Sequence, residues 1–196
     1  LDLPFEHGRY RSMRPVVFER VADAERLLDC GVGTGRNIPY YPPRAKVVGI
    51  DLSIEMMARA IGRGRALGRE VSWVQADITS LPWADSSFDA ATATFLFCVL
   101  PDELQSAALR ELARVVKPGG RIVLLEYVLS RNRLRRWTMR RLWGPWIRFA
   151  YGASFERPTH EHLESLGFIV EERRFLHADT ILLLVAKNRS FRTGPP

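Results

Sequence analysis

The sequence predicts an α/β fold in which a doubly wound, mostly parallel sheet of seven strands ends in an antiparallel hairpin. Short runs rich in β-branched residues alternate with longer segments of helical periodicity, and this order builds βαβ units. The last two runs are separated by too few residues for a crossover helix, so they are expected to pair antiparallel. The chain has 196 residues, of which 46% are hydrophobic, so one domain with a sizeable core is expected.

The strand and helix segments follow one another along the whole chain. Strands are expected at residues 26–30, 46–51, 71–75, 88–95 and 121–127, and the two hairpin strands at residues 168–175 and 179–187. Helices are expected at residues 53–66, with Ser53 as N-cap, at residues 101–116, opened by Asp102 after a proline, and at residues 159–166. No repeat or linker divides the sequence, so residues 1–196 are expected to form a single domain.

Composition argues against several classes of protein. The two cysteines, Cys30 and Cys98, each lie in an apolar stretch, so neither a disulfide framework nor a metal site is expected. The longest apolar run, residues 181–186, is far shorter than the roughly 20 residues that span a bilayer. We therefore expect a globular cytoplasmic protein. Its net charge of +7 points to an anionic partner, either nucleic acid or a membrane surface.

A glycine-rich turn follows the first strand. Gly31, Gly33 and Gly35 can adopt positive φ angles and let a ligand lie directly on the backbone, while Asp29 just before them can accept hydrogen bonds from an ammonium group. A tight strand-to-helix turn without a ligand is the structural alternative. A dinucleotide fingerprint, Gly-x-Gly-x-x-Gly, would need a glycine at position 36, where this chain has Arg36, so NAD or FAD fits poorly.

Two further carboxylates end the second and third strands. Asp51 is placed to accept hydrogen bonds from both hydroxyls of a ribose, and Asp77 to accept one from an adenine amino group. Each alone could be an ordinary helix cap or turn residue. Three acids at three successive strand ends beside one glycine turn predict a nucleoside site at the carboxyl edge of the sheet.

These motifs resemble the class I S-adenosylmethionine-dependent methyltransferases, whose fold is Rossmann-like, over nearly all of residues 24–187. The resemblance also includes Ser87-Phe88-Asp89 and Val116-Lys117-Pro118-Gly119-Gly120. It implies S-adenosylmethionine as cofactor and S-adenosylhomocysteine as product, with the first motif holding the methionine portion, the second acid the ribose and the third acid the adenine. The cofactor residues so implied are Asp29, Gly31, Gly33, Gly35, Asn37, Asp51, Leu52, Met56, Asp77, Ile78 and Thr94.

A basic, aromatic segment at residues 131–155 sets the chain apart. Residues 131–151 contain seven arginines and no acidic residue, which equals the whole excess of 29 basic over 22 acidic side chains. Tryptophan and tyrosine favour the headgroup level of a membrane, and arginines near an anionic leaflet add attraction. The membrane-binding residues expected here are Arg133, Arg136, Trp137, Arg140, Trp143 and Trp146. A helix packed over the sheet edge, with its arginines merely solvated, is the alternative.

The substrate prediction comes from this segment and from a narrower resemblance. The chain resembles bacterial phosphatidylethanolamine N-methyltransferases and the related ubiquinone and menaquinone C-methyltransferases, in motifs such as Leu-Pro-Trp-x-Asp-x-Ser-Phe-Asp. Base-methylating enzymes usually carry Asn/Asp-Pro-Pro-Tyr after the fourth strand, where this chain has Thr94-Phe95-Leu96-Phe97, so no nucleic-acid partner is expected. We expect methylation of phosphatidylethanolamine, and of its methylated intermediates, towards phosphatidylcholine. The alternatives are a quinone precursor or another small lipophilic acceptor such as a thiol.

An ethanolamine ammonium must lose a proton before its lone pair can attack. The candidate catalytic residues are Glu126, Tyr127, Tyr151 and His160, although His160 could equally cap its helix. We expect a monomer without a bound metal, peripherally associated with the inner face of the cell membrane, with an anionic membrane surface and its phospholipid substrate as partners.

Overall fold

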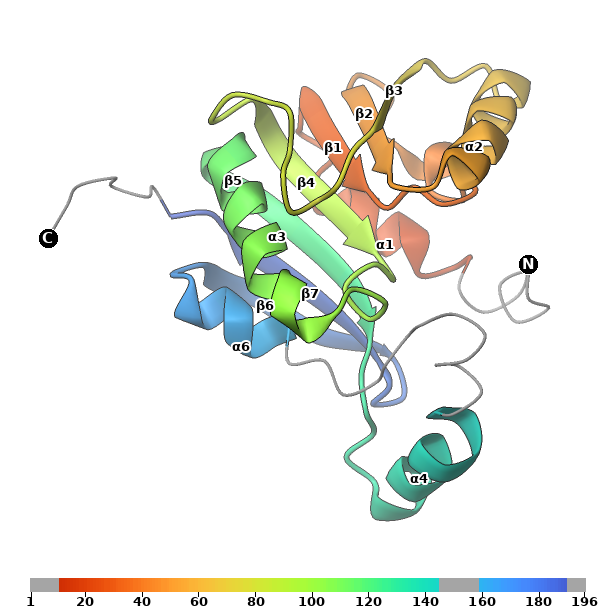
Figure 1. The fold of residues 1–196 in the computed structure, drawn as a ribbon, viewed down its shortest axis with the longest axis vertical. Helices are drawn as coiled ribbons and strands as arrows, with labels where there is room; N and C mark the ends of the chain where they lie inside the picture. The colour runs from red at the N-terminus through yellow and green to blue at the C-terminus, as the bar shows by residue number, and fades with distance from the viewer. Residues whose placement is uncertain (1–10, 145–158, 190–196) are drawn as a thin grey trace, which may run out of the picture.

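The computed structural model describes residues 11–144 and 159–189. Its elements are arranged as Figure 1 shows. In chain order they are α1 (Arg14–Glu19), β1 (Arg26–Cys30), η2 (Ile38–Tyr40), β2 (Lys46–Asp51), α2 (Ile54–Ala66), β3 (Val71–Gln75), β4 (Phe88–Thr94), α3 (Asp102–Val115), β5 (Val116–Tyr127), α4 (Arg133–Thr138), η3 (Met139–Trp143), α6 (Thr159–Ser165), β6 (Ile169–His177) and β7 (Ile181–Lys187).

One mixed sheet organises the molecule. Its strand order is β3-β2-β1-β4-β5-β7-β6. The first five strands in sequence pair in parallel, whereas β7 is antiparallel to both β5 and β6. The fold class predicted from the sequence is therefore confirmed. The carboxyl ends of β1 and β2 lie next to each other, because Cys30 is level with Ile50.

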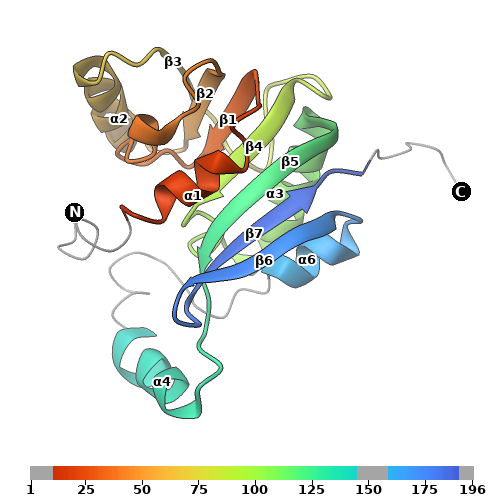
Figure 2. The same cartoon turned by 180° about the vertical axis from the view of Figure 1, so that it is seen from behind.

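Helices cover both faces of this sheet. Along β5, Ile122 and Leu124 belong to one apolar cluster, and the alternate residues Val123 and Leu125 belong to another. The first cluster receives α3 and α6, which Figure 1 shows in front of the sheet. The second receives α1, which Figure 2 shows on the opposite side. Both faces being buried explains why the central strands read as nearly continuous apolar runs.

The observed bounds differ from the expected ones at a few places. Strand β4 ends one residue early because Phe95 has a positive φ of 57°, which extended backbone does not allow. Helix α1 was not predicted at all. The N-cap of α2 is confirmed, since the Ser53 hydroxyl accepts a hydrogen bond of 3.2 Å from the Met56 backbone N–H. Within residues 11–144 and 159–189, no helix is long and apolar enough to cross a membrane.

Candidate functional site

The glycine turn after β1 adopts the conformation that the sequence predicts. Gly31, Gly33 and Gly35 have φ angles of +67°, +53° and +76°. Their surroundings differ. A Cβ on Gly35 would lie 2.9 Å from the backbone of Ala60 in α2, so this glycine permits close packing of the turn on the helix. A Cβ on Gly33 would meet no atom within 4 Å, so the turn faces open space there. Only this second arrangement leaves room for a ligand on the backbone.

Asp29 lies at the centre of a buried polar network. Its carboxylate is fully buried and accepts hydrogen bonds from the Tyr41 hydroxyl at 2.6 Å, from the Thr92 hydroxyl at 2.9 Å and from the Asn37 amide. Burial raises the pKa of Asp29, while these hydrogen bonds act in the opposite direction. Protein donors occupy both oxygens, so a direct bond from Asp29 to a cofactor ammonium stays a prediction. What the structure shows is that Asp29 holds Asn37 in place.

Arg14 of α1 completes this network and was missed in the sequence. Its Nη1 donates to the Asn37 amide oxygen and, at 3.2 Å, to the Thr94 hydroxyl. The side chain is buried, and its charge lies close enough to Asp29 to favour the ionised carboxylate. A single arginine in the apolar run of residues 13–18 was the available signal, because a charge in the buried face of a helix needs a partner. Arg14 thus joins the N-terminal helix to the end of β4.

Asp51 is oriented by two backbone donors. The Gly33 N–H donates to one carboxylate oxygen at 2.7 Å, and the Ser53 N–H donates to the other at 2.9 Å. This fixes the carboxylate at the end of β2, against the glycine turn. Beside it Leu52 and Met56 are 66% and 38% exposed, which is unusual for apolar side chains and leaves a surface that a flat ring could cover.

The third acid has a local role that the structure shows directly. Asp77 is exposed and accepts hydrogen bonds of 2.8 Å from both the backbone N–H and the hydroxyl of Thr79. It therefore caps a turn, and the contact with an adenine amino group remains a prediction. Ile78 next to it is buried in the core. Since Asp51 is level with Gln75 in the sheet, Asp77 follows β3 at the same edge as Asp51.

The residues at and after the end of β4 lie against Asn37 and the glycine turn. The Thr94 hydroxyl accepts a hydrogen bond from the Asn37 amide at 3.0 Å. Phe95 takes the strained positive φ, and its ring lies 4.8 Å from the ring of Tyr127. Leu96 lies close to the glycine turn, because a Cβ added to Gly31 would lie 2.9 Å from Cδ1 of Leu96. Strain of this kind is common at functional sites, where surrounding contacts hold it in place.

The predicted catalytic residues fare differently. Glu126 is 2% exposed and accepts hydrogen bonds from the backbone N–H groups of Phe97, at 3.1 Å, and Cys98, at 2.7 Å. Desolvation by burial raises the pKa of Glu126 to about 8, against the effect of those donors. Tyr127 is half-buried against Phe95. The last two candidates are Tyr151 and His160. Tyr151 and the side chain of His160 lie outside the described part of the chain.

The predicted membrane segment forms α4 and η3, which both views show projecting away from the sheet (Figures 1 and 2). Leu134, Trp137 and Leu142 are 73%, 56% and 63% exposed. Arg133 and Arg140 are exposed beside them, whereas Arg136 is half-buried and donates to the Ser130 carbonyl at 2.8 Å. The side chain of Trp143, and all of Trp146, lie outside the described residues.

The chain is similar in sequence to proteins of a known family. Residues 27–120 match the model of a protein family described as "Methyltransferase domain". These residues, a little under half of the chain, match a methyltransferase domain. S-adenosylmethionine is the cofactor that the match supports, so the predicted resemblance is confirmed at the level of the family.

Two relatives of this methyltransferase domain carry different printed activities. A demethylmenaquinone methyltransferase from Thermus thermophilus is 42% identical over 106 residues, which are 53% of this chain and 47% of the relative. A phosphatidylethanolamine N-methyltransferase from Cereibacter sphaeroides is 38% identical over 104 residues, which are 52% and 50% of the two chains. The chain thus spans about half the length of the curated relatives it matches. The family is shared, and the methyl acceptor differs between the relatives.

The fold extends beyond the matched residues. The solved structure of a geranyl diphosphate methyltransferase in complex with SAM has a TM-score of 0.73 at 15% identity, and the match covers 91% of this chain and 84% of that one. Identity this low shows the shared fold alone. At 91% of this chain, the structural match extends well beyond residues 27–120.

Proposed function

We propose that the protein transfers methyl groups from S-adenosylmethionine to the amine of phosphatidylethanolamine and its methylated intermediates at an anionic membrane surface, towards phosphatidylcholine. The observation that carries the proposal is the projecting segment formed by α4 and η3. It exposes Leu134, Trp137 and Leu142 next to arginines, on a part of the molecule that stands away from the sheet. A membrane surface would cover these apolar side chains and attract the basic ones.

The residues of the described site fit the cofactor. Gly33 leaves open space over the turn, and Asp51 holds a carboxylate in a fixed orientation for two ribose hydroxyls. Leu52 and Met56 offer an apolar surface on which an adenine ring can lie. Arg14, fixed by Asn37 and Thr94, brings a positive charge to the side where the methionine carboxylate would be held. When bound, S-adenosylmethionine supplies a methyl group already activated by its sulfonium.

The protein's task is then to align an amine with that methyl group and to exclude water. Phe95 and Tyr127 place two ring faces at the end of β4, and ring faces attract the ammonium of an ethanolamine headgroup before it loses its proton. Glu126 acts on this arrangement indirectly, because its carboxylate accepts hydrogen bonds from the backbone N–H groups of Phe97 and Cys98. In this proposal it positions the turn that carries Phe95 and Leu96.

Attachment to the membrane brings the acceptor to the site. Each arginine near an anionic leaflet contributes on the order of 1 kcal/mol, and the stems of the arginines can lie along apolar surface while their charges stay in water. Arg133 and Arg140 are exposed and can act in this way, together with Trp137. Several such weak contacts hold a protein at a bilayer reversibly, which suits an enzyme that must release its lipid product.

Methylation of a quinone precursor is the second candidate, because the Thermus relative at 42% identity is a demethylmenaquinone methyltransferase. That acceptor is also a membrane lipid, so the projecting segment fits it equally. The difference lies in the chemistry of the acceptor: a quinone needs an apolar slot for a flat ring, whereas an ethanolamine headgroup needs contacts for an ammonium and a phosphate.

One assay separates the two candidates. The purified protein is incubated with methyl-labelled S-adenosylmethionine and vesicles of phosphatidylethanolamine and phosphatidylglycerol, and in parallel with vesicles containing demethylmenaquinone. We expect label in monomethyl phosphatidylethanolamine. Label in the quinone alone would replace this proposal by the second candidate.

A variant pair tests the membrane step in the same assay. Trp137→Ala should lower turnover on vesicles and reduce co-sedimentation with them, while leaving cofactor affinity unchanged. Leu104→Ala, which removes an exposed leucine of α3 instead, is the matched control and should behave as the wild type. Equal vesicle binding by both variants would show that the projecting segment does not attach the protein.

A further inference from the structure

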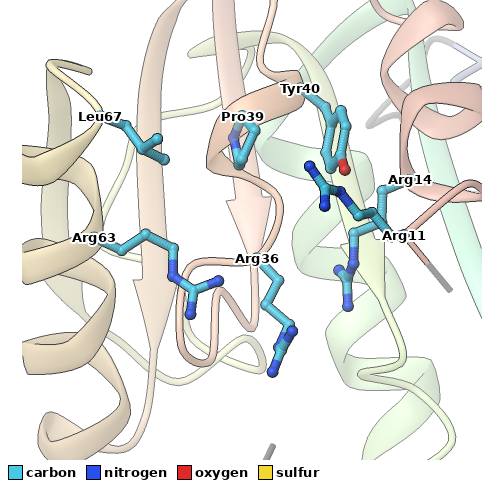
Figure 3. A pocket seen from close by; sticks show the side chains of 7 residues that line it. All are labelled: Arg11, Arg14, Arg36, Pro39, Tyr40, Arg63 and Leu67. Carbon is cyan, nitrogen blue, oxygen red and sulfur yellow. The ribbon is translucent and has the colours of Figure 1, made fainter. Parts of the chain in front are cut away.

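Two features border the cofactor residues. On the side of α1 and α2 lies a hollow of about 320 Å³ lined largely by arginines, which Figure 3 shows; its Arg14 already belongs to the network around Asp29. On the side of β5, the strand ends at Tyr127, whose ring lies beside that of Phe95, and the chain continues through residues 128–132 into α4. These residues, which we call the connection, join the site to the projecting segment formed by α4 and η3.

The turn between β6 and β7 fixes the path of the connection. Tyr127 is level with Ile181, the first residue of β7, so this turn lies beside the end of β5. The Val128 N–H donates to the Thr180 carbonyl at 2.9 Å, which extends the contact between the two strands by one residue. Ser130 follows and is fully buried, although its side chain is polar. A buried hydroxyl needs a partner, and the turn supplies one.

That partner is the carboxylate of Asp179, in the same turn. Its Oδ2 accepts hydrogen bonds from the Ser130 hydroxyl at 2.7 Å and from the Arg131 backbone N–H at 2.6 Å. Its Oδ1 accepts one at 2.6 Å from Nη1 of Arg135, which lies in α4. These donors, the Ser130 hydroxyl first, hold the pKa of Asp179 well below its ordinary value. The ionised side chain is 23% exposed, so water screens its contacts less than those of a fully exposed pair.

Polar contacts join α4 to the connection. Besides the ion pair of Arg135 with Asp179, Nε of Arg136 donates to the Ser130 carbonyl at 2.8 Å. None of residues 133–138 is buried, so α4 has no side chain of its own in the apolar core. The direction in which α4 projects from the end of β5 therefore depends on the contacts of Asp179 and Ser130.

We propose that Asp179 is a positioning residue, which fixes the direction of the projecting segment so that a membrane-attached molecule presents the end of β5 to the lipid headgroups. The proposal rests on the proposed function, because it requires attachment through α4 and η3. Attachment alone does not account for an acidic residue at this place, since a carboxylate among arginines weakens their attraction to an anionic leaflet. Asp179 reduces that attraction and at the same time orients the segment.

Turnover on two forms of the same acceptor tests this role. Each variant of the full chain is incubated with methyl-labelled S-adenosylmethionine and phosphatidylethanolamine, either in vesicles with phosphatidylglycerol or as the dihexanoyl lipid dispersed below its critical micelle concentration. Asp179→Asn removes the charge and one acceptor oxygen, and Ser130→Ala removes the hydroxyl donor without a change of charge. Asp23→Asn, at an exposed position between α1 and β1, is the control for the change of charge. Co-sedimentation with the vesicles is measured alongside.

We expect Asp179→Asn to lower turnover on vesicles about tenfold, in line with the loss of a charged hydrogen bond, while turnover on the dispersed lipid stays at the wild-type value. Its co-sedimentation should be equal or stronger, because the variant carries one negative charge fewer. Ser130→Ala should act in the same direction, and Asp23→Asn should match the wild type. Wild-type turnover of Asp179→Asn on vesicles would overturn the proposal. An equal fall on both forms of the lipid, or a parallel fall in sedimentation, would also overturn it, because Asp179 would then maintain the fold or the attachment.

A measurement that needs no activity separates this proposal from the proposed function. Paramagnetic labels on Arg141→Cys in η3 and Glu103→Cys in α3, both exposed positions, report the distance between the segment and the sheet by double electron–electron resonance. The native Cys30 and Cys98 are buried and do not compete for the label. We expect a narrow distance distribution that Asp179→Asn broadens, and equally narrow distributions would overturn the proposal even if the lipid is methylated. Broadening in a protein that methylates neither form of the lipid would refute the proposed function alone.

Discussion

Replacement of Glu126 by glutamine should remove one contribution to the pH dependence of the free energy of unfolding. The folded protein holds the proton of Glu126 up to about pH 8, because burial raises the pKa from its ordinary value of 4.5. The unfolded chain loses that proton above 4.5. Between these two values the folded state binds more protons, so the free energy of unfolding of the wild type falls as the pH rises, and above about 8 it no longer changes for this reason.

The size of the effect follows from the shift. Each unit of pH between the two pKa values is equivalent to about 1.4 kcal/mol, so the wild type should lose about 2.5 kcal/mol between about pH 5 and about pH 7 through this group. Glutamine has the shape of a protonated glutamate and does not titrate. The glutamine amide keeps only one of the two oxygens that accept from Phe97 and Cys98, which shifts the stability of the variant by an amount that does not vary with pH. The stability of Glu126→Gln relative to the wild type should therefore rise by about 2.5 kcal/mol between about pH 5 and about pH 7.

Urea unfolding followed by tryptophan fluorescence at a series of pH values measures this difference. Other titrating groups are common to both proteins and cancel when the two curves are subtracted. Glu103→Gln, at an exposed position in the first turn of α3, is the control for the substitution itself. Parallel stability curves for wild type and Glu126→Gln would refute the reasoning, because they would mean that Glu126 is ionised in the folded protein at neutral pH.

Three other changes have expected outcomes. Asp51→Asn should weaken S-adenosylmethionine binding at least about tenfold by calorimetry, since one charged acceptor for the ribose is lost, and an unchanged affinity would place the ribose elsewhere. Tyr41→Phe removes the 2.6 Å hydrogen bond to the buried Asp29 and should lower the free energy of unfolding by about 1–3 kcal/mol in urea; a loss within error would mean that water replaces the hydroxyl. Gly35→Ala should lower the melting temperature because its Cβ would meet the backbone of α2 at 2.9 Å, whereas Gly62→Ala, with no atom within 4 Å, should not.

Much of the fold can be predicted from local patterns in the sequence. Strand runs, the Ser53 cap and the short connection between the last two strands depend on local chemistry, so their positions agree with the structure to within a few residues. The start of β5 at Val116 does not, because it depends on pairing with β4 across the sheet. Helix α1 was missed for a related reason: six residues with a proline near the start have little helical signal of their own and are stabilised by packing on the sheet.

The candidate site likewise contains residues that short motifs predict and residues that they do not. The three glycines and Asp51 were found because a turn with positive φ and a carboxylate at a strand end are visible in short motifs. The network around Asp29 was not, since Tyr41, Thr92 and Arg14 lie far apart in sequence and meet only in the folded protein.

The contact between Arg14 and the buried side chains near Asp29 bears on how small a working unit can be. The family match begins at residue 27, after the helix that supplies this guanidinium. A chain that began there would lack the guanidinium that lies close to the buried Asp29 carboxylate, and a chain that ended at residue 120 would lack most of β5 as well as β6 and β7. The segment by which the family is recognised is therefore smaller than the packed unit, because α1 and β7 outside it both contribute residues to the apolar core of the sheet.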